Sequence, residues 1–590
     1  MADKLRITLA QLNQRVGDIP GNAQAVLQAR KAAGPADLVV FPELHLIGYP
    51  PEDLVLNPAL VEKAAAHLQM LAEASAAPGP AMLVGAPFVL DGALHNGVAL
   101  LDQGRIAAVR LKHELPNYGT FDEKRLFQPG PLPEPVVLRG TMPGVPICED
   151  IWQPDVCRHL ADFGAEMFIC INGSPYEADK DTLRIENVAK RRAIDTGLPL
   201  AYLNRVGGQD ELVFDGASFV VNGDGALAVQ ACDWEEQVVS TNWTRTAQGW
   251  RCDRGELAEL ASDQEARYCA IVLALRDHVE RSGFTGVVLG LNGGIDSALC
   301  AALAVDALGA ARVWGVAMPS RFTPAVVCER ALACARMLGI RYTQMPIGDS
   351  VDAIEAMLGE AFEGTARDLA EENLRARLRG TALMALSNKF GPMILSCANK
   401  SALSLGTATL YGDLAGGFAP LKDVYRTQVL ELARWRNRHV PRIGSGAAAR
   451  VIPEAVLAAA CEAPEMAMST GGGATQTALS VFGDAPQGAR GIGRAGNGRG
   501  SGGQGAVVGA GEAMPGYDIL DTILCEMVEH DRSAEQLVAE GFARATVSQI
   551  EDLLHATEFK RRQAPPGVKL SARNFGRDRR YPLTHAFRTV

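Results

Sequence analysis

The chain has 590 residues, of which 47% are hydrophobic and 21% are charged, and this length allows several domains with large buried cores. The composition excludes a disordered, collagen-like or disulfide-stapled protein. Its 57 Lys and Arg residues stand against 68 Asp and Glu residues, a formal net charge of −11. This balance argues against a nucleic-acid-coating protein and favours small-molecule partners.

Cysteine usage and the N-terminus indicate a compartment. The 12 cysteines include no Cys-x-x-Cys pair and no zinc-type cluster, a pattern typical of the reduced thiols of cytosolic proteins. The N-terminal run MADKLRITLAQLN lacks the apolar centre of a signal peptide. No apolar stretch approaches the roughly 18 to 20 residues that span a bilayer. We therefore expect a cytoplasmic protein without membrane contact.

The first 230 residues alternate short β-rich runs with helical patterns, which predicts a layered α/β region. The strand candidates include residues 7–12, 38–41, 82–88, 145–147, 167–171 and 200–204, and a further one ends at Lys112. The helical candidates are residues 22–33, 58–76 and 180–196. The polar stretch 241–254 then predicts a linker.

A second domain is predicted to start at Ser262, because Glu265 three positions later completes a capping-box signal. Strand candidates 287–291, 313–318 and 342–347 follow with helices between them. Consecutive βαβ units of this kind predict a parallel sheet with ligands at the carboxyl ends of its strands. We expect domains at 1–245 and 262–590, joined by a linker at 246–261.

Residues 444–514 break this order. The segment is Ala-rich and then Gly-rich, and 15 of the 61 glycines fall between Gly471 and Gly511. Without a sustained hydrophobic period it predicts a disordered loop. The run from Gly491 to Gly496 has the dinucleotide spacing, but no strand precedes it, so we assign it no function.

Three chemically active residues each follow a predicted strand of the first domain. Cys148 lies in VPICEDIW, Glu43 in FPELHLIGYPPEDL and Lys112 in VRLKHELPNYGTFDEKRLF. A lone cysteine is most often a small buried hydrophobe, and a lone Glu or Lys is most often solvated. Three such residues at strand ends of one α/β layer can instead converge on a single pocket.

This part of the chain resembles the nitrilase superfamily, and most closely the glutaminase domain of glutamine-dependent NAD synthetases. The resemblance is carried by YGTFDEKRLF, ICEDIW, NGSPYEADKDTLR and RVGGQDELVFDG. It implies an αββα sandwich in which Cys148 attacks glutamine, Glu43 is the general base and Lys112 stabilises the oxyanion. A thiolate near pH 7 needs such a base and cation. Further glutamine-binding residues implied by the resemblance are Tyr118, Glu123, Ser174 and Lys180.

A glycine-rich loop opens the second domain. In VVLGLNGGIDSALCAAL a strand is followed by Gly293 and Gly294, and a helix then starts with Asp296 and Ser297. Backbone N–H groups and a helix N-terminus suit a pyrophosphate. An ordinary βα turn with a capping Asp has the same sequence pattern. No Walker lysine is present.

This loop is similar to the Ser-Gly-Gly-x-Asp-Ser loop of pyrophosphate-releasing ATP enzymes. MPSRFT, EENLRARLRG, SNKFGPMILSCANKSA, TLYGDLAGGFAPLKDVYRT and FKRRQAPPGVKLSARNFGRDRRYP extend the resemblance to NAD synthetases. It implies a doubly wound, Rossmann-like sheet of the adenine nucleotide alpha hydrolase type. It also implies that Mg-ATP adenylates deamido-NAD and ammonia then displaces AMP, with ATP as substrate and no tightly bound organic cofactor.

The resemblance assigns individual residues to these substrates. The expected ATP-binding residues are Gly290, Leu291, Asn292, Gly293, Gly294, Ile295, Asp296, Ser297 and Cys397. The expected deamido-NAD-binding residues are Asn373, Ala402 and Lys560. Asp296 is the magnesium candidate, and Lys400 and Asp413 are weaker candidates for phosphate and magnesium contacts. Members of this family assemble from several subunits, so we expect a homo-oligomer.

The chain departs from the family pattern at several positions. Asn292 replaces a Ser, Cys397 a Thr, Ala398 a Gly, Ala402 a Glu and Thr407 a Tyr, and the acidic substrate loop is replaced by the Ala/Gly-rich run. An altered reading frame and real divergence both account for that run. Two alternatives therefore stay open: another glutamine-fed ATP ligase, and a synthetase-like protein that binds without turnover at its second site.

Overall fold

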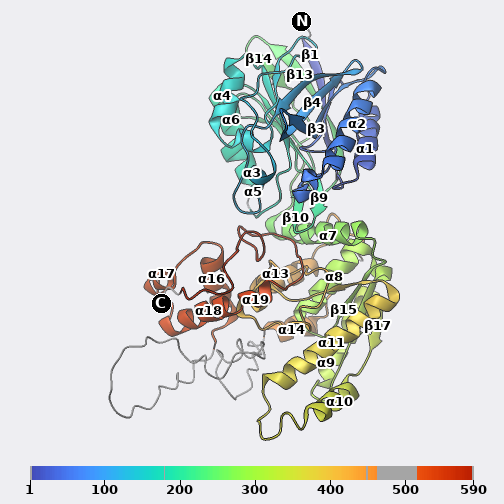
Figure 1. The fold of residues 1–590 in the computed structure, drawn as a ribbon, viewed down its shortest axis with the longest axis vertical. Helices are drawn as coiled ribbons and strands as arrows, with labels where there is room; N and C mark the ends of the chain where they lie inside the picture. The colour runs from blue at the N-terminus through green and yellow to red at the C-terminus, as the bar shows by residue number, and fades with distance from the viewer. Residues whose placement is uncertain (1–2, 179, 447–449, 462–513, 588–590) are drawn as a thin grey trace. The chain divides into compact units, whose positions relative to one another are not determined.

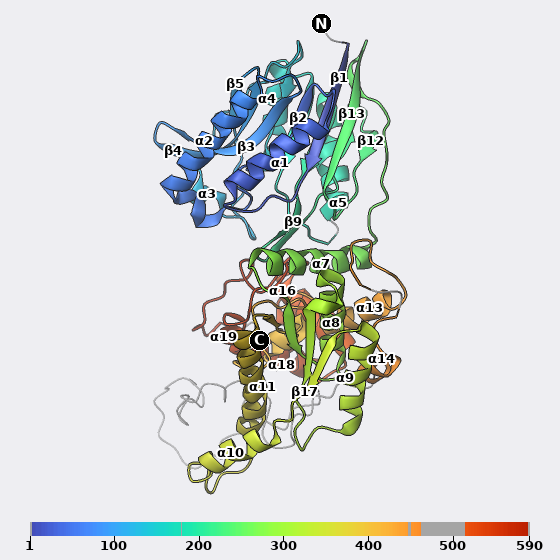
Figure 2. The same ribbon diagram turned by 90° about the vertical axis from the view of Figure 1, so that its right-hand side faces the viewer.

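The structure is a computed structural model that describes residues 3–178, 180–446, 450–461 and 514–587. The chain divides into two compact units, Met1–His278 and Val279–Val590, which are drawn in Figures 1 and 2. The division falls inside α7 (Asp263–Arg281). This helix begins directly after Ser262, where the capping signal predicts a helix start.

The first unit contains two large sheets and a hairpin. The seven-stranded sheet has the order β14-β13-β1-β2-β3-β4-β5 and the five-stranded sheet the order β12-β11-β8-β7-β6. The strands of the first sheet are β1 (Lys4–Gln11), β2 (Leu38–Val40), β3 (Ala81–Leu90), β4 (Ala93–Asp102), β5 (Arg105–Leu111), β13 (Gln237–Thr246) and β14 (Gly249–Cys252). Those of the second are β6 (Pro143–Gly144), β7 (Met167–Asn172), β8 (Leu200–Asn204), β11 (Phe219–Val221) and β12 (Leu227–Gln230). The hairpin consists of β9 (Val206–Gln209) and β10 (Leu212–Asp215).

Helices cover the outer face of each sheet. The helices described in this unit are α1 (Ile19–Ala32), η1 (Glu52–Leu56), α2 (Pro58–Ala74), α3 (Glu123–Leu126), η2 (Cys148–Ile151), α4 (Pro154–Asp162), α5 (Lys180–Thr182), the π-helical η3 (Leu183–Ala189) and α6 (Lys190–Thr196). One core joins Ile7 and Val40 of the first sheet to Ile169 of the second. Separate clusters pack α1 and α2 on the first sheet and α4 and α6 on the second, on opposite sides in Figure 1. The predicted αββα sandwich is confirmed.

Two local predictions in this unit are wrong. The polar stretch 241–254 is not a linker, because it forms most of the β13–β14 hairpin, and β13 pairs antiparallel with all of β1. Trp243, Trp250 and Cys252 are buried and alternate with more exposed residues. This alternation of buried and exposed side chains is typical of a strand, and it forms one here although most of the residues are polar. Residues 145–147 make only an isolated bridge between Ile147 and Ile171, next to the two-residue strand β6.

The second unit is built on a four-stranded parallel sheet of order β17-β16-β15-β18. Its strands are β15 (Val287–Gly290), β16 (Val313–Ala317), β17 (Arg341–Gln344) and β18 (Met393–Leu395). Helices α8 (Ile295–Leu308) and α9 (Ala325–Leu338) contact the sheet. Val351 of α10 (Gly348–Leu358) and Leu383 of α11 (Leu369–Phe390) pack on side chains of the strands. The sheet is parallel and helix-covered, as predicted for the doubly wound class.

The second unit contains further helices, several of which share a second core. They are η4 (Ala310–Arg312), α12 (Lys400–Leu405), α13 (Arg426–Arg436), α14 (Glu454–Cys461), α16 (Tyr517–Val528), α17 (Ala534–Ala539), α18 (Arg544–Ala556) and α19 (Glu558–Arg561). Leu403 of α12, Leu524 of α16 and Leu554 of α18 share one apolar core. This core holds the C-terminal part of the chain against the segment that follows β18.

Part of the segment predicted to be a disordered loop is helical. Within residues 444–514, α14 buries Val456 and Leu457 and contacts α8 and α13. The glycine-rich remainder, including the run from Gly491 to Gly496, lies outside the described residues. Throughout the described ranges, we find no helix with the length and apolarity that a membrane span requires.

Candidate active sites

Three of the predicted glutaminase residues meet inside the first unit. Lys112 Nζ lies 2.7 Å from Glu43 Oε1 and 2.8 Å from Glu123 Oε2, and all three side chains are buried. Glu43 follows β2, Lys112 follows β5 and Glu123 begins α3. Strand ends of one sheet therefore bring together residues that are 69 positions apart in the sequence.

Neighbouring polar groups fix these carboxylates in place. Asn96 Nδ2 donates to Glu43 Oε1 at 2.7 Å, and the Gly173 N–H donates to Glu43 Oε2 at 2.9 Å. Tyr49 donates its hydroxyl proton to Glu123 Oε1 at 2.9 Å. The sequence analysis missed Asn96 and Tyr49. Asn96 had one usable signal, because it is a polar residue within the apolar run of β4.

Charge and burial set the protonation states of this cluster. Burial alone would lower the pKa of Lys112, but Glu123 and Glu43 hold that pKa well above its usual value. Burial raises the pKa of Glu123 to about 7, helped by Glu43 and opposed by Lys112. Two buried carboxylates share one ammonium, so the second carboxylate ionises with difficulty.

Cys148 is the first residue of η2 and is 5% exposed. Its φ of 48° is left-handed, a strained conformation for an L-residue that is typical of functional sites. Burial and the negative charge of Glu43 raise the pKa of its thiol, and Lys112 opposes them. The thiol is therefore protonated near pH 7 and needs a base to become a nucleophile.

The other predicted glutamine-binding residues differ in burial and in their partners. Tyr118 is exposed and its hydroxyl donates to both carboxylate oxygens of Glu149 at 3.0 Å. Lys180 Nζ lies 5.7 Å from the centre of the Phe121 ring, which stacks edge-on with Tyr118. Ser174 is buried, and its N–H donates to Asn204 Oδ1 at 3.0 Å.

The second unit contains a cavity of about 540 Å³ at the carboxyl ends of its parallel strands. Seven of the predicted ATP and deamido-NAD residues line it: Gly290, Leu291, Asn292, Asp296, Ser297, Cys397 and Ala402. Arg379 and Asp413 also line it. Sequence reasoning did not single out Arg379, whose pKa is lowered by burial.

The side chain of Asn292 accepts hydrogen bonds from two other groups of the glycine-rich loop. Asn292 Oδ1 accepts hydrogen bonds from the Gly294 N–H at 3.0 Å and from Ser297 Oγ at 2.7 Å. Gly293 has a φ of 71°, and a Cβ there would lie 2.3 Å from the carbonyl oxygen of Val327 in α9. Gly293, Gly294 and Ile295 shape this turn without lining the cavity.

The predicted deamido-NAD residues Asn373 and Lys560 make hydrogen bonds within the second unit. Asn373 of α11 is buried and accepts from Thr409 Oγ1 at 2.9 Å. Lys560 of α19 donates to the Gly406 carbonyl, and burial lowers its pKa to about 8 against the attraction of Asp413. Neither side chain is among the cavity lining.

Lys400 does not line the cavity either. Its ammonium is fully buried and lies 2.7 Å from Glu529 Oε1 and 2.8 Å from Asp423 Oδ1. It also donates to Ser571 Oγ at 2.8 Å and to the Arg573 carbonyl at 2.9 Å. Lys400 thereby ties α12 to the C-terminal segment.

Side chains of the cavity offer oxygen ligands but no complete metal cage. Asp296 and Asp413 both line it, and Asp296 Oδ1 accepts from Asn399 Nδ2 at 2.8 Å. Over the residues that the structure describes, no three His, Cys, Asp or Glu side chains gather into a metal-binding group. One or two carboxylates completed by substrate phosphates and water are the usual protein site for Mg²⁺, so this donor set fits that ion.

Comparisons with known proteins cover both units. The carbon–nitrogen hydrolase family matches residues 6–251, and the NAD synthase family matches residues 267–464. The glutamine-dependent NAD(+) synthetase of Rhodobacter capsulatus is 44% identical over 592 residues, covering 100% of both chains. That of Xylella fastidiosa (strain Temecula1) is 38% identical over 596 residues, also covering 100% of both chains.

Solved structures give the same result. The glutamine-dependent NAD+ synthetase of Acinetobacter baumannii, solved with adenosine diphosphate, is 37% identical, has a TM-score of 0.73 and is matched over 98% of each chain. A synthetase from Cytophaga hutchinsonii shares the fold, with a TM-score of 0.77 at 18% identity, over 99% of this chain and 98% of that chain. The matches run the length of the chain and include both units in order, and the chain belongs to the glutamine-dependent NAD(+) synthetase family.

Proposed function

We propose that this protein is a glutamine-hydrolysing ligase that converts deamido-NAD to NAD. In this reaction ATP adenylates the nicotinate carboxylate with release of pyrophosphate, and ammonia then displaces AMP. Glutamine hydrolysis in the first unit supplies the ammonia. The observation that carries this proposal is the buried cluster of Glu43, Lys112 and Glu123, of which Glu43 and Lys112 act on the pKa of the Cys148 thiol, together with full-length family membership.

In the first unit, each residue of the cluster has a proposed step. Glu43 takes the Cys148 proton, and the sulfur forms a bond to the side-chain carbonyl carbon of glutamine. Lys112 stabilises the oxyanion. Its collapse breaks the C–N bond while Glu43 returns the proton to the leaving nitrogen, which departs as ammonia. Water then hydrolyses the thioester to glutamate. Tyr118, Ser174 and Lys180 hold the glutamine, and Glu123 holds Lys112.

In the second unit, the cavity at the strand ends takes ATP. The loop from Gly290 to Ser297 binds the phosphates and Cys397 lies beside the nucleotide. Asn373, Ala402 and Lys560 face deamido-NAD. The adenosine diphosphate bound to the Acinetobacter baumannii relative supports a nucleotide site in this fold.

Asp296 would hold Mg²⁺, with Asp413 as a second carboxylate. The ion would neutralise the charge of the ATP phosphates as pyrophosphate leaves. On the family resemblance we also propose a cytoplasmic homo-oligomer. Cys148, Cys157 and Cys170 are thiols rather than disulfides, which suits a reducing compartment. Sedimentation of the purified chain tests the oligomeric state.

The decisive experiment measures NAD formation from deamido-NAD and ATP, once with glutamine and once with ammonium. The wild-type chain should use both. Cys148→Ala should abolish the glutamine-driven reaction and leave the ammonium-driven one. Cys252→Ala, which removes another buried thiol of the same unit, is the matched control and should keep both.

Other outcomes separate the alternatives. Loss of both activities in Cys148→Ala would contradict the assignment of separate sites. ATP binding without turnover in the wild-type chain would favour a synthetase-like binding protein. Glutamine-dependent AMP release only with a different carboxylate would favour another ATP ligase.

A further inference from the structure

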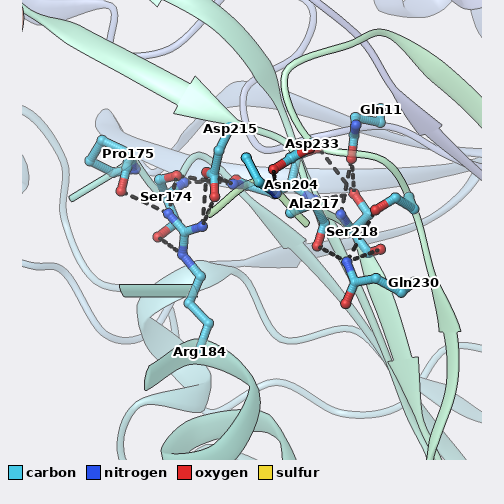
Figure 3. Close-up of polar contacts among 12 residues, drawn as sticks. Gln11, Ser174, Pro175, Arg184, Asn204, Asp215, Ala217, Ser218, Gln230 and Asp233 are labelled. Carbon is cyan, nitrogen blue, oxygen red and sulfur yellow. Dashed lines mark hydrogen bonds and ion pairs between the residues drawn. The ribbon is translucent and has the colours of Figure 1, made fainter. Parts of the chain in front are cut away.

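We infer that Arg184 is a positioning residue of the glutaminase site, acting on glutamine through Ser174. The inference rests on the proposed function of the first unit and names a residue that this function does not yet use. Figure 3 shows Arg184 with Ser174, Pro175 and Asp215.

The segment after β7 is the part of the site that Arg184 contacts. The Gly173 N–H donates to the base Glu43, and the Ser174 N–H donates to Asn204 Oδ1. The Tyr176 N–H donates to the Val213 carbonyl at 2.7 Å. This segment thus joins the catalytic base to the proposed glutamine-binding serine within two residues.

All three guanidinium nitrogens of Arg184 contact this segment or its support. Nε donates to Ser174 Oγ at 3.1 Å. Nη2 donates to the carbonyls of Ser174 at 2.9 Å and Pro175 at 2.7 Å. Nη1 lies 2.8 Å and 2.7 Å from the two carboxylate oxygens of Asp215. Arg184 Nε therefore fixes the position of Ser174 Oγ, which also faces the buried Tyr202 hydroxyl.

Burial makes the arrangement rigid. Arg184 and Asp215 are 2% and 3% exposed, and a buried charge must keep its partners. Asn204 Nδ2 donates to the Ser174 carbonyl at 3.0 Å, and the Asn204 N–H donates to Ser218 Oγ at 3.0 Å. Ser218 Oγ in turn donates to Gln11 Oε1 at 2.8 Å, so the Ser174 segment is tied to β1 (Figure 3).

A local irregularity of the helix accompanies this contact. Arg184 lies in the π-helical segment η3, where the Lys190 N–H donates to the Ile185 carbonyl five residues earlier. Such turns are rare and occur frequently at functional sites. Here the turn carries a side chain that spans Ser174, Pro175 and Asp215.

A lysine cannot reproduce these contacts, because its single nitrogen lacks the planar fork of three. Lysine does keep the positive charge opposite Asp215. Arg184→Lys therefore separates two roles: a mere counter-charge would be preserved, whereas the orientation of Ser174 would be lost.

The experiment measures steady-state glutamine hydrolysis and ammonium-driven NAD synthesis with the full-length chain. For Arg184→Lys we expect the KM for glutamine to rise about 10- to 100-fold, the effect of losing hydrogen bonds from a charged donor. The kcat should change less than the KM, because Lys112 and Asn96 still hold Glu43. Ammonium-driven synthesis and the thermal midpoint report that the chain is folded.

Two further variants keep the test decisive. Arg139 makes a two-pronged ion pair with Asp102 in the same unit, and Arg139→Lys should leave the glutamine KM unchanged. If Arg184→Lys does not fold, the double variant Arg184→Met with Asp215→Leu removes both buried charges and should show the same rise in KM.

The outcomes distinguish the inference from the function it rests on. A glutamine KM within twofold of wild type in folded Arg184→Lys would overturn the positioning role. An equal rise in KM for Arg139→Lys would overturn it as well, because the effect would then be unspecific. A wild-type chain that does not hydrolyse glutamine would instead overturn the proposed function.

Discussion

Glu43 and Lys112 form a fully buried ion pair, with Oε1 2.7 Å from Nζ. Glu123 completes the group from the other side of the ammonium at 2.8 Å. One buried cation therefore serves two carboxylates. Because of burial and this surplus of negative charge, Glu123 keeps its proton up to a pKa of about 7.

Stability of the first unit should fall as the pH rises from about 4.5 to about 7. The pKa of Glu123 is about 7 in the folded chain, above its ordinary value of 4.5, mainly because of burial. The folded state thus binds this proton more tightly, so its stabilising effect is complete below about pH 4.5 and is lost as the pH passes 7. The difference corresponds to about 3 kcal/mol. Urea unfolding followed by hydrogen exchange of β4 amides measures it.

Glu123→Gln supplies the comparison, because the amide keeps the shape and cannot ionise. Its unfolding free energy should depend less on pH between 4.5 and 7 than that of the wild type. Parallel pH profiles for the two chains would contradict the assignment of this proton to Glu123.

Asn292 should control access of phosphate to the glycine-rich loop. Its Oδ1 accepts from the Gly294 N–H and from Ser297 Oγ, donors that a phosphate oxygen would otherwise use. Asn292→Asp places a negative charge on the same donors and should raise the KM for ATP about 100-fold, since each charged hydrogen bond is worth roughly 1.5 to 3 kcal/mol. Asn292→Ser should bind ATP at least as well as the wild type.

ATP titration of both variants checks this prediction. Cys148-dependent glutamine hydrolysis, measured without ATP, is the control for folding of the first unit. Tight ATP binding by Asn292→Asp would show that the side chain swings clear of the phosphates.

Gly380 should be required for the shape of the ATP cavity. It lies within α11, and a Cβ there would stand 2.4 Å from the carbonyl oxygen of Tyr411. Gly380→Ala must push the backbone next to Gly412 and Asp413 away, so it should destabilise the unit by about 1 to 3 kcal/mol and weaken ATP binding. Gly348→Ala in α10 meets no atom within 4 Å and is the matched control. Similar thermal midpoints for the two variants would contradict the predicted clash.

Binding of deamido-NAD should weaken as the pH rises through about 8. Burial lowers the pKa of Lys560 to about 8, so its positive charge is lost above that pH, and with it the attraction to an anionic substrate. Lys560→Arg keeps its charge throughout this range and should show a flat KM between pH 7 and 9. The KM for deamido-NAD in ammonium-driven synthesis is the measurement. A wild-type KM that stays constant across pH 8 would exclude Lys560 from this role.

The sequence by itself predicts where the candidate site residues stand relative to the strands and helices. Glu43 and Lys112 stand directly after strands whose apolar patterns are local, and the glycine-rich loop sits between a strand and a helix start. Apolar periodicity and turn residues act over a few positions, which is why the layered α/β region, the parallel sheet and the two candidate pockets were predictable, whereas the αββα sandwich came from the family resemblance.

Only the tertiary structure decided which distant groups meet. Asn96 and Gly173 both donate hydrogen bonds to Glu43. Arg184 contacts both Ser174 and Asp215. Lys400 is enclosed by acidic and hydroxyl groups that lie 23 to 171 positions away in the sequence. The β13–β14 hairpin was mistaken for a linker because its partner, β1, lies more than 220 residues away. Side-chain periodicity shows that a face is buried but not against what, so buried charges and edge pairings follow only from the packed fold.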